Sequence, residues 1–129
     1  MNKNVRTRDE DDEMLATTFA SRYHWGKIGG PEQLATADWQ VARAASLAGL
    51  PELALRFAER ALERTEDAGL RDYHIASRYE GLARAHACAG NDAERDRYIA
   101  RAKEALANIS DADDREVIER QLSSVPGYG

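Results

Sequence analysis

The sequence is poor in cysteine, in aromatic residues and in long apolar runs. Cys88 is its one cysteine, so no intramolecular disulfide can form, which suits a reducing compartment. Aromatic residues make up 7% of the chain although 43% of it is hydrophobic, because alanine supplies much of the apolar content. Alanine is the strongest helix former, and β-branched residues are few. No apolar run is long enough for a secretory signal or a membrane span. These absences predict an all-α, cytoplasmic protein.

The charge of the chain limits the partners that it can bind. Its 18 basic and 23 acidic residues give a net charge of −5, which makes general nucleic-acid binding a poor fit. An acidic run from Asp9 to Glu13 falls where a helix is expected to begin, and the helix dipole stabilises carboxylates there. The three histidines and Cys88 lack the spacing of a zinc site or of a catalytic dyad. We therefore assign no catalytic residue, metal or cofactor, and we expect neither nucleic acid nor a membrane as a partner.

Apolar periodicity and helix-boundary residues predict about six helices in a single domain. Thr7 and Glu10 have the spacing of a capping box. Pro31 and Pro51 stand where helices begin, a position at which the missing N–H costs nothing. The expected segments are a cap helix at 8–25, a first helix pair at 31–68, a second pair at 72–109, a capping helix at 111–123 and a loose tail at 124–129. No segment reads as a strand.

The two helix pairs are related by an internal repeat with an offset of 41 residues. Gly49 falls on Gly90, and the segment 42–44 (Ala-Arg-Ala) falls on the identical segment 83–85. Among the 30 pairs counted from Thr36 onward, nine are identical, and they lie in both helices and in the turn between them. Such a pattern indicates a repeated supersecondary unit.

This unit, a helix, a glycine turn and a second helix, resembles the tetratricopeptide repeat in the stretches 39–62 and 79–106. The small residues that the family expects fall on Ala42, Ala54, Ala61, Ala83 and Ala102. The offset exceeds the usual period of about 34 residues, and Arg95 stands where the first copy has Ala54. The chain also resembles a group of small bacterial tetratricopeptide-like proteins with a Tyr-His-Trp segment, here 23–25. The resemblance implies antiparallel helix pairs stacked as a short right-handed solenoid.

In such a solenoid the first helix of each pair lines a concave groove. The groove residues that the resemblance implies are Trp39, Arg43, Ser46, Leu47, Ser77, Glu80 and Arg84. Arg43 and Arg84 are repeat equivalents, and two parallel guanidinium groups suit a carboxylate or phosphate ligand. For Arg84 we favour the alternative of an ion pair with Glu80, which lies four residues earlier on the same helix face. Trp39 fits either a ligand platform or the core, with burial slightly ahead.

Three functions are compatible with these patterns. The favoured one is a non-catalytic module that binds a protein or peptide in the groove lined by the first helix of each pair. The second is a small-molecule sensor or enzyme with a pocket between the cap helix and the repeats. Its residues would be Tyr23, His24, Trp25, His74 and Glu80. The third is a structural oligomerisation subunit. Two repeats leave apolar end faces, so an incomplete cap would favour a homodimer.

Overall fold

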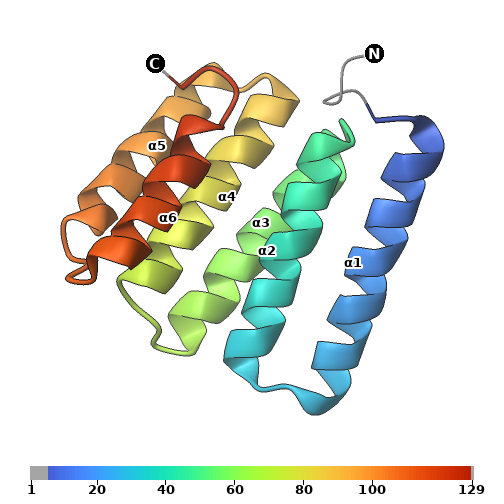
Figure 1. The fold of residues 1–129 in the computed structure, drawn as a ribbon, viewed down its shortest axis with the longest axis horizontal. Coiled ribbons are helices and arrows are strands. Elements are labelled where there is room, and N and C mark those ends of the chain that lie inside the picture. The colour runs from blue at the N-terminus through green and yellow to red at the C-terminus, as the bar shows by residue number, and fades with distance from the viewer. Residues whose placement is uncertain (1–5, 129) are drawn as a thin grey trace.

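The computed structural model describes residues 6–128, and within this range every regular element is a helix. The six helices are α1 (Arg8–Ile28), α2 (Pro31–Leu47), α3 (Pro51–Asp67), α4 (Tyr73–Ala89), α5 (Asp92–Leu106) and α6 (Ala112–Ser123) (Figure 1). The predicted all-α class is confirmed.

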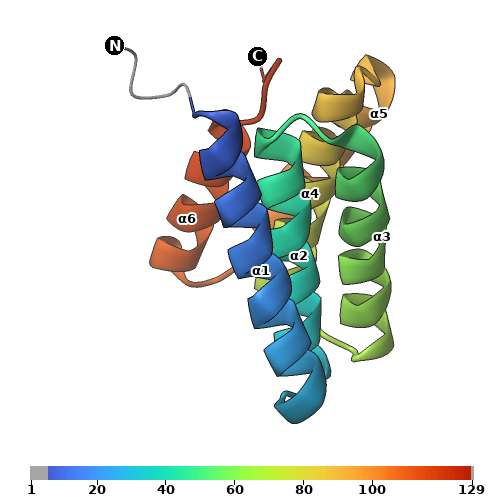
Figure 2. The ribbon, with the colours of Figure 1, turned by 90° about the vertical axis from the view of Figure 1, so that its right-hand side faces the viewer.

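The helices lie in layers around a central pair. α2 and α4 are neighbours in the middle of the molecule, α3 and α5 lie on one side of them, and α6 lies on the other side over α4 (Figure 2). α1 lies against α2 at the end of the molecule away from α5 (Figure 1). Each of the consecutive pairs α2/α3 and α4/α5 is joined by a tight turn at a glycine.

Local chemistry fixes most helix boundaries. Thr7 Oγ1 accepts a hydrogen bond from the Glu10 N–H at 3.1 Å, and the Thr7 N–H donates to Glu10 Oε1 at 2.9 Å, so the expected capping box is present. Pro31 and Pro51 occupy the first positions of α2 and α3. The glycines that end α2, α3 and α4 have positive φ angles of 74°, 72° and 77°, a region in which a Cβ is strained.

α1 is longer than the sequence predicts, because it continues through Gly26 to Ile28. A glycine inside a helix costs only about 1 kcal/mol, which neighbouring turns can offset. The helix ends at Ile28, and the following Gly29 N–H donates a hydrogen bond to the Trp25 carbonyl at 2.8 Å.

The core consists of two clusters that meet along α4. Alanines of α2, α3 and α4 surround Leu82 in the first cluster, so these helix backbones approach one another closely. The second joins α4 and α5 to α6 through larger side chains such as Ile118 and Leu122. Val125, which lies in the tail that was expected to be loose, is only 3% exposed and packs into this second cluster. The tail is therefore anchored as far as Val125, because its valine extends the apolar face of α6.

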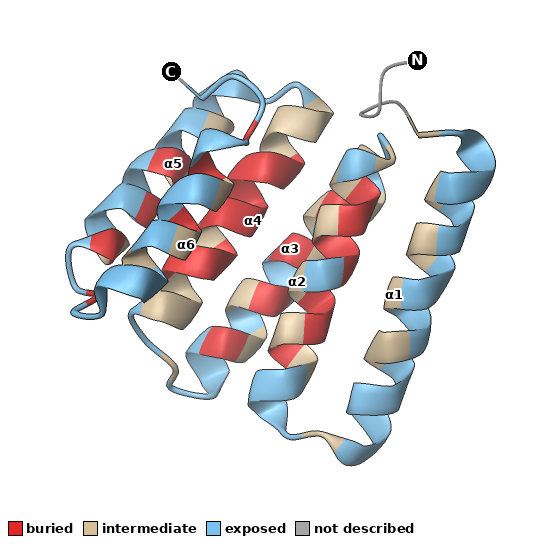
Figure 3. Ribbon diagram, viewed as in Figure 1, coloured by how far each residue is buried: buried red, intermediate tan, exposed pale blue. Residues whose placement is uncertain are grey.

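Burial is distributed very unevenly over the helices (Figure 3). α4 is buried along most of its length, whereas α1 has no buried residue. Gly81 allows the closest approach to α4, since a Cβ built there would lie 2.7 Å from Trp39 Cδ1. The absence of a side chain at Gly81 thus lets the Trp39 ring lie directly on α4.

Candidate functional site

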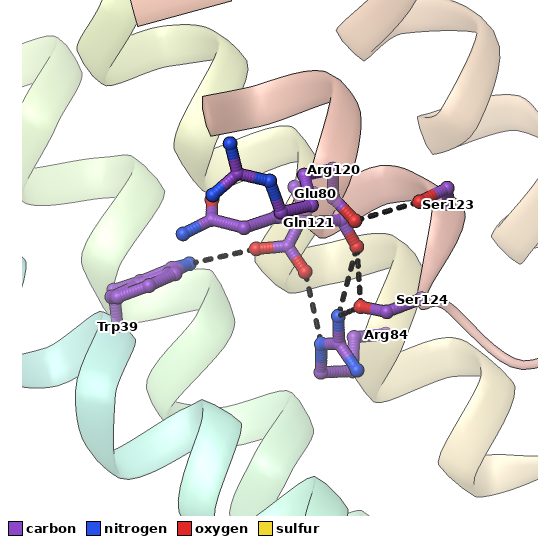
Figure 4. Close-up of polar contacts among 7 residues, drawn as sticks. All are labelled: Trp39, Glu80, Arg84, Arg120, Gln121, Ser123 and Ser124. Atoms are coloured by element: carbon purple, nitrogen blue, oxygen red, sulfur yellow. Dashed lines mark hydrogen bonds and ion pairs between the residues drawn. The ribbon is translucent and has the colours of Figure 1, made fainter. Parts of the chain in front are cut away.

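A polar cluster connects α2, α4 and α6 (Figure 4). The carboxylate of Glu80, which is fully buried, accepts a hydrogen bond from Trp39 Nε1 at 3.3 Å and another from Arg84 Nε at 2.9 Å. The favoured ion pair between Arg84 and Glu80 is therefore confirmed. Trp39 is half-buried, and its indole N–H is used inside the protein.

The C-terminal end of α6 contacts this cluster through Arg84. Arg84 Nη2 donates to the Gln121 carbonyl at 3.0 Å and to Ser124 Oγ at 2.6 Å (Figure 4). This position follows from packing, because α6 must bury Ile118 and Leu122 against α4 and α5. As a result the C-terminal carbonyl end of α6, which carries a partial negative charge, lies on the Arg84 guanidinium.

Three of the seven predicted groove residues are consequently removed from the surface. Ser77, Glu80 and Arg84 are 4%, 0% and 5% exposed. Ser77 Oγ accepts from Arg78 Nη1 at 3.2 Å and so belongs to an interior network. The α4 half of the expected groove is thus filled by α6, and a partner could reach only the α2 half.

Arg43 differs sharply from its repeat equivalent Arg84. Its guanidinium lies 6.0 Å from the centre of the Trp39 ring, and Trp39 stands at the repeat position of Glu80. Arg43 Nη1 is buried without a hydrogen-bond partner, and no ion pair among residues 6–128 involves this side chain. Burial lowers the pKa of Arg43, and the nearby charge of Arg84 lowers it further, while Glu80 acts in the opposite direction. Together Arg43, Arg84 and Glu80 carry one positive charge in excess.

A furrow runs beside Arg43 between α1 and α2, and we call it the α1–α2 groove. One hollow of about 370 Å³ is lined by Met14, Thr17, Thr18, Ser21, Gln40, Arg43, Ala44 and Leu47. A second hollow of about 270 Å³ is lined by Trp25, Glu32, Gln33, Thr36 and Gln40. Both hollows have Gln40 in their lining, so they lie next to each other along α2. The groove combines apolar walls and hydroxyl groups with the guanidinium of Arg43 in the first hollow and the carboxylate of Glu32 in the second.

A buried carboxylate holds the α1 wall of this groove in place. Asp38 of α2 is fully buried, and its Oδ1 accepts a hydrogen bond from Arg22 Nε of α1 at 2.6 Å. Its Oδ2 lies 2.7 Å from Arg64 Nε of α3, with the N–H not aimed at the oxygen, so this contact is an ion pair only. An edge-to-face contact between Phe19 and Phe57 adds a second attachment of α1. These contacts fix the width of the groove.

Of the other four predicted groove residues, Arg43 and Leu47 line the α1–α2 groove, whereas Trp39 and Ser46 are not among its lining residues. Leu47 is 41% exposed. Ser46 is half-buried, and its Oγ has no hydrogen-bond partner. The second hypothesis placed a pocket between α1 and the repeats, and of its α1 residues Trp25 lines the second hollow, but it did not include the α1 residues that line the first hollow. The available signal was the set of small hydroxyl residues at 17, 18 and 21 beside the apolar stripe of that helix.

The residues of the second hypothesis, the small-molecule pocket, are not gathered into one site. Tyr23 is 69% exposed with Lys27 Nζ over its ring, whereas Glu80 is sealed in the interior. His74 Nε2 lies 3.4 Å from Glu32 Oε1 and is thus engaged with the start of α2. Within residues 6–128, no three His, Cys, Asp or Glu side chains gather as a metal site would require. In the same range, none of the helices has the length and apolarity to cross a membrane.

Within residues 6–128 the fold and the site are those of an all-α protein whose half-buried Arg43, which has no ion-pair partner in this range, lies beside an interhelical groove. No protein-family model, curated protein or solved structure matches the chain.

Proposed function

We propose that this protein is a non-catalytic interaction module, and that its α1–α2 groove binds a protein or peptide segment carrying a carboxylate. The observation that carries the proposal is Arg43, a half-buried cation with no acid partner in the described residues. An arginine desolvated without a counter-ion is costly. A bound carboxylate would neutralise the excess charge and could accept two parallel N–H groups.

The shape of the groove favours a chain segment over a compact small molecule. Its two hollows follow α1 and α2 past Gln40, from Leu47 at one end to Glu32 at the other. The apolar side chains of Met14 and Leu47 offer contacts for the ligand's own apolar groups, and the Thr17 and Ser21 hydroxyls offer hydrogen bonds. A peptide with an acidic side chain or a free C-terminus combines these chemistries.

The proposal includes the tetratricopeptide-like architecture, a short solenoid of two stacked helix pairs in a cytoplasmic protein. It is supported by equivalent positions in the two copies. Ala42 and Ala83 are both fully buried, and Ala61 and Ala102 are 1% and 0% exposed. α2 and α4 each have 17 residues and each precedes a glycine with positive φ.

A peptide-library screen tests this function. We expect the wild-type protein to enrich peptides that bear an internal Asp or Glu or a free C-terminal carboxylate. An Arg43→Gln variant should bind the enriched peptides about 10- to 100-fold more weakly, the loss expected for a charge-assisted hydrogen bond.

The matched control is Arg56→Gln, since Arg56 is an exposed arginine on α3. Its binding should equal that of the wild-type protein. Enrichment of peptides without a carboxylate, or equal binding by the Arg43→Gln variant, would remove the proposed site.

A further inference from the structure

The outward face of α1 has no partner within the described chain. α1 has 21 residues and none is buried, although Tyr23 and Ile28 are 69% and 67% exposed. Its other face lines the α1–α2 groove through Thr18. Each residue of a helix turns the direction of its side chain by about 100°. Asp9, Ala16, Ala20 and Lys27 therefore lie within about 20° of the direction opposite to Thr18, and all four are exposed.

The acidic and basic residues of this outward stripe lie at opposite ends of the helix. Its N-terminal end carries Asp9, whereas its C-terminal end carries Lys27. Two alanines lie between these charged ends, where a second helix could approach closely. When two copies of this helix pair in antiparallel orientation, the acidic end of each copy therefore lies beside the basic end of the other.

We propose that α1 pairs with α1 of a second copy of this chain, antiparallel about a two-fold axis that crosses the helix at the level of Thr18, on the face opposite to the Thr18 side chain. In this register Ala16 lies opposite Ala20 of the partner subunit. Asp9 lies opposite Lys27 of the partner subunit, and the two-fold axis repeats both contacts. The interface is isologous, so one surface supplies both sides.

The two-fold register is the reason for choosing a second copy as the occupant. Asp9 and Lys27 each lie nine residues from Thr18, so the two-fold axis brings this acid and this base together twice. An unrelated partner would impose no such symmetry on α1. The pairing uses the side of α1 opposite to Thr18, so the α1–α2 groove of each copy stays open. It is therefore independent of the proposed function.

Charge exchange at the two ends of the stripe tests the pairing. Sedimentation equilibrium of the wild-type chain should show a reversible dimer that weakens as salt is added, because salt screens exposed charge pairs. Asp9→Lys and Lys27→Asp each place like charges opposite one another in both symmetric contacts. We expect each single variant to weaken dimerisation at least about tenfold, and the double variant to return to within about threefold of the wild-type dissociation constant.

A steric variant tests the centre of the stripe. Ala20→Gln keeps a good helix former at an exposed position but holds the helices apart, so it should abolish the dimer. The matched control is Ala100→Gln, at an exposed alanine of α5, which should leave the dimer unchanged. Circular dichroism of each variant verifies that the helices are intact.

Three results would overturn the pairing. They are a wild-type chain that stays monomeric up to about 1 mM, single charge variants that dimerise as the wild type does, and a double variant that does not recover. The first result excludes any dimer, while the other two exclude this register.

Discussion

α1 and α4 are helices of similar length in the same small protein, yet they keep their charges in opposite environments. Nine of the 17 residues of α4 are buried, and three of them are the charged residues Arg78, Glu80 and Arg84. None of the 21 residues of α1 is buried, and its acidic run lies in solvent. The difference follows from position, because α4 has neighbours on several sides and α1 lies chiefly against α2.

The two helices also satisfy their buried or half-buried cations differently. Arg78 of α4 has no carboxylate partner and instead donates to the hydroxyls of Thr65, Ser77 and Thr36 at 3.0, 3.2 and 3.0 Å. Burial is the main cause that lowers the pKa of Arg78. Arg22 of α1 reaches inward to a carboxylate while remaining partly in water. The buried Arg78 of the central helix thus relies on hydroxyl partners inside the protein, whereas Arg22 of the end helix keeps contact with solvent.

The largest effect is expected where a buried charge loses its partner. Arg84→Met should lower the free energy of unfolding by about 3–5 kcal/mol, since it leaves the fully buried Glu80 without its cation. Arg43→Met should change it by less than about 0.5 kcal/mol, because Arg43 has no acid to abandon. Urea denaturation of both variants measures the difference. Equal losses would contradict the different environments described for these repeat equivalents.

Two leucine-to-alanine substitutions test whether α4 and α1 each unfold together with the rest of the protein. Leu82→Ala in α4 should cost about 2–5 kcal/mol, because Leu82 is only 1% exposed. Leu15→Ala in α1, at a half-buried position, should cost about 1 kcal/mol. Hydrogen exchange should then accelerate in every helix for the first variant and mainly in α1 for the second. Uniform acceleration caused by Leu15→Ala would show that α1 unfolds only with the rest of the protein.

Two glycine substitutions give the smallest and most selective comparison. Gly81→Ala places a Cβ 2.7 Å from Trp39 Cδ1, and the resulting overpacking of about 1–3 kcal/mol exceeds the helix-propensity gain of about 0.5–1 kcal/mol. Gly26→Ala in α1 meets only Leu34 Cδ1 at 3.9 Å, so the gain of about 0.5–1 kcal/mol should remain. Thermal unfolding should therefore move in opposite directions for the two variants. A stabilised Gly81→Ala protein would mean that Trp39 has room to shift.

Sequence reasoning predicted the helices well because their boundaries are local. The capping box at Thr7, the prolines that begin α2 and α3, and the glycines at 49, 69 and 90 act within a few residues. The pair Arg84–Glu80 was equally predictable, since the two residues are one helical turn apart. The end of α1 was missed because a single interior glycine does not stop a helix.

The binding site was harder to predict because its parts come from distant segments. Asp38 joins α1 and α3 through arginines that lie 16 residues before it and 26 residues after it. Nothing in the local pattern indicates that an acid on α2 receives both. The hydroxyl residues of α1 likewise line the groove only because the Asp38 carboxylate holds α1 beside α2.

The sequence alone determined about six helices, the capping box at Thr7 and the 41-residue repeat that makes Arg43 and Arg84 equivalent. Only the tertiary structure decided how these two arginines differ. The apolar face of α6 docks against α4 and α5 and brings the Gln121 carbonyl onto Arg84, while Arg43 Nη1 has no hydrogen-bond partner within residues 6–128. The cause is packing between remote segments, which two locally similar stretches of sequence do not encode.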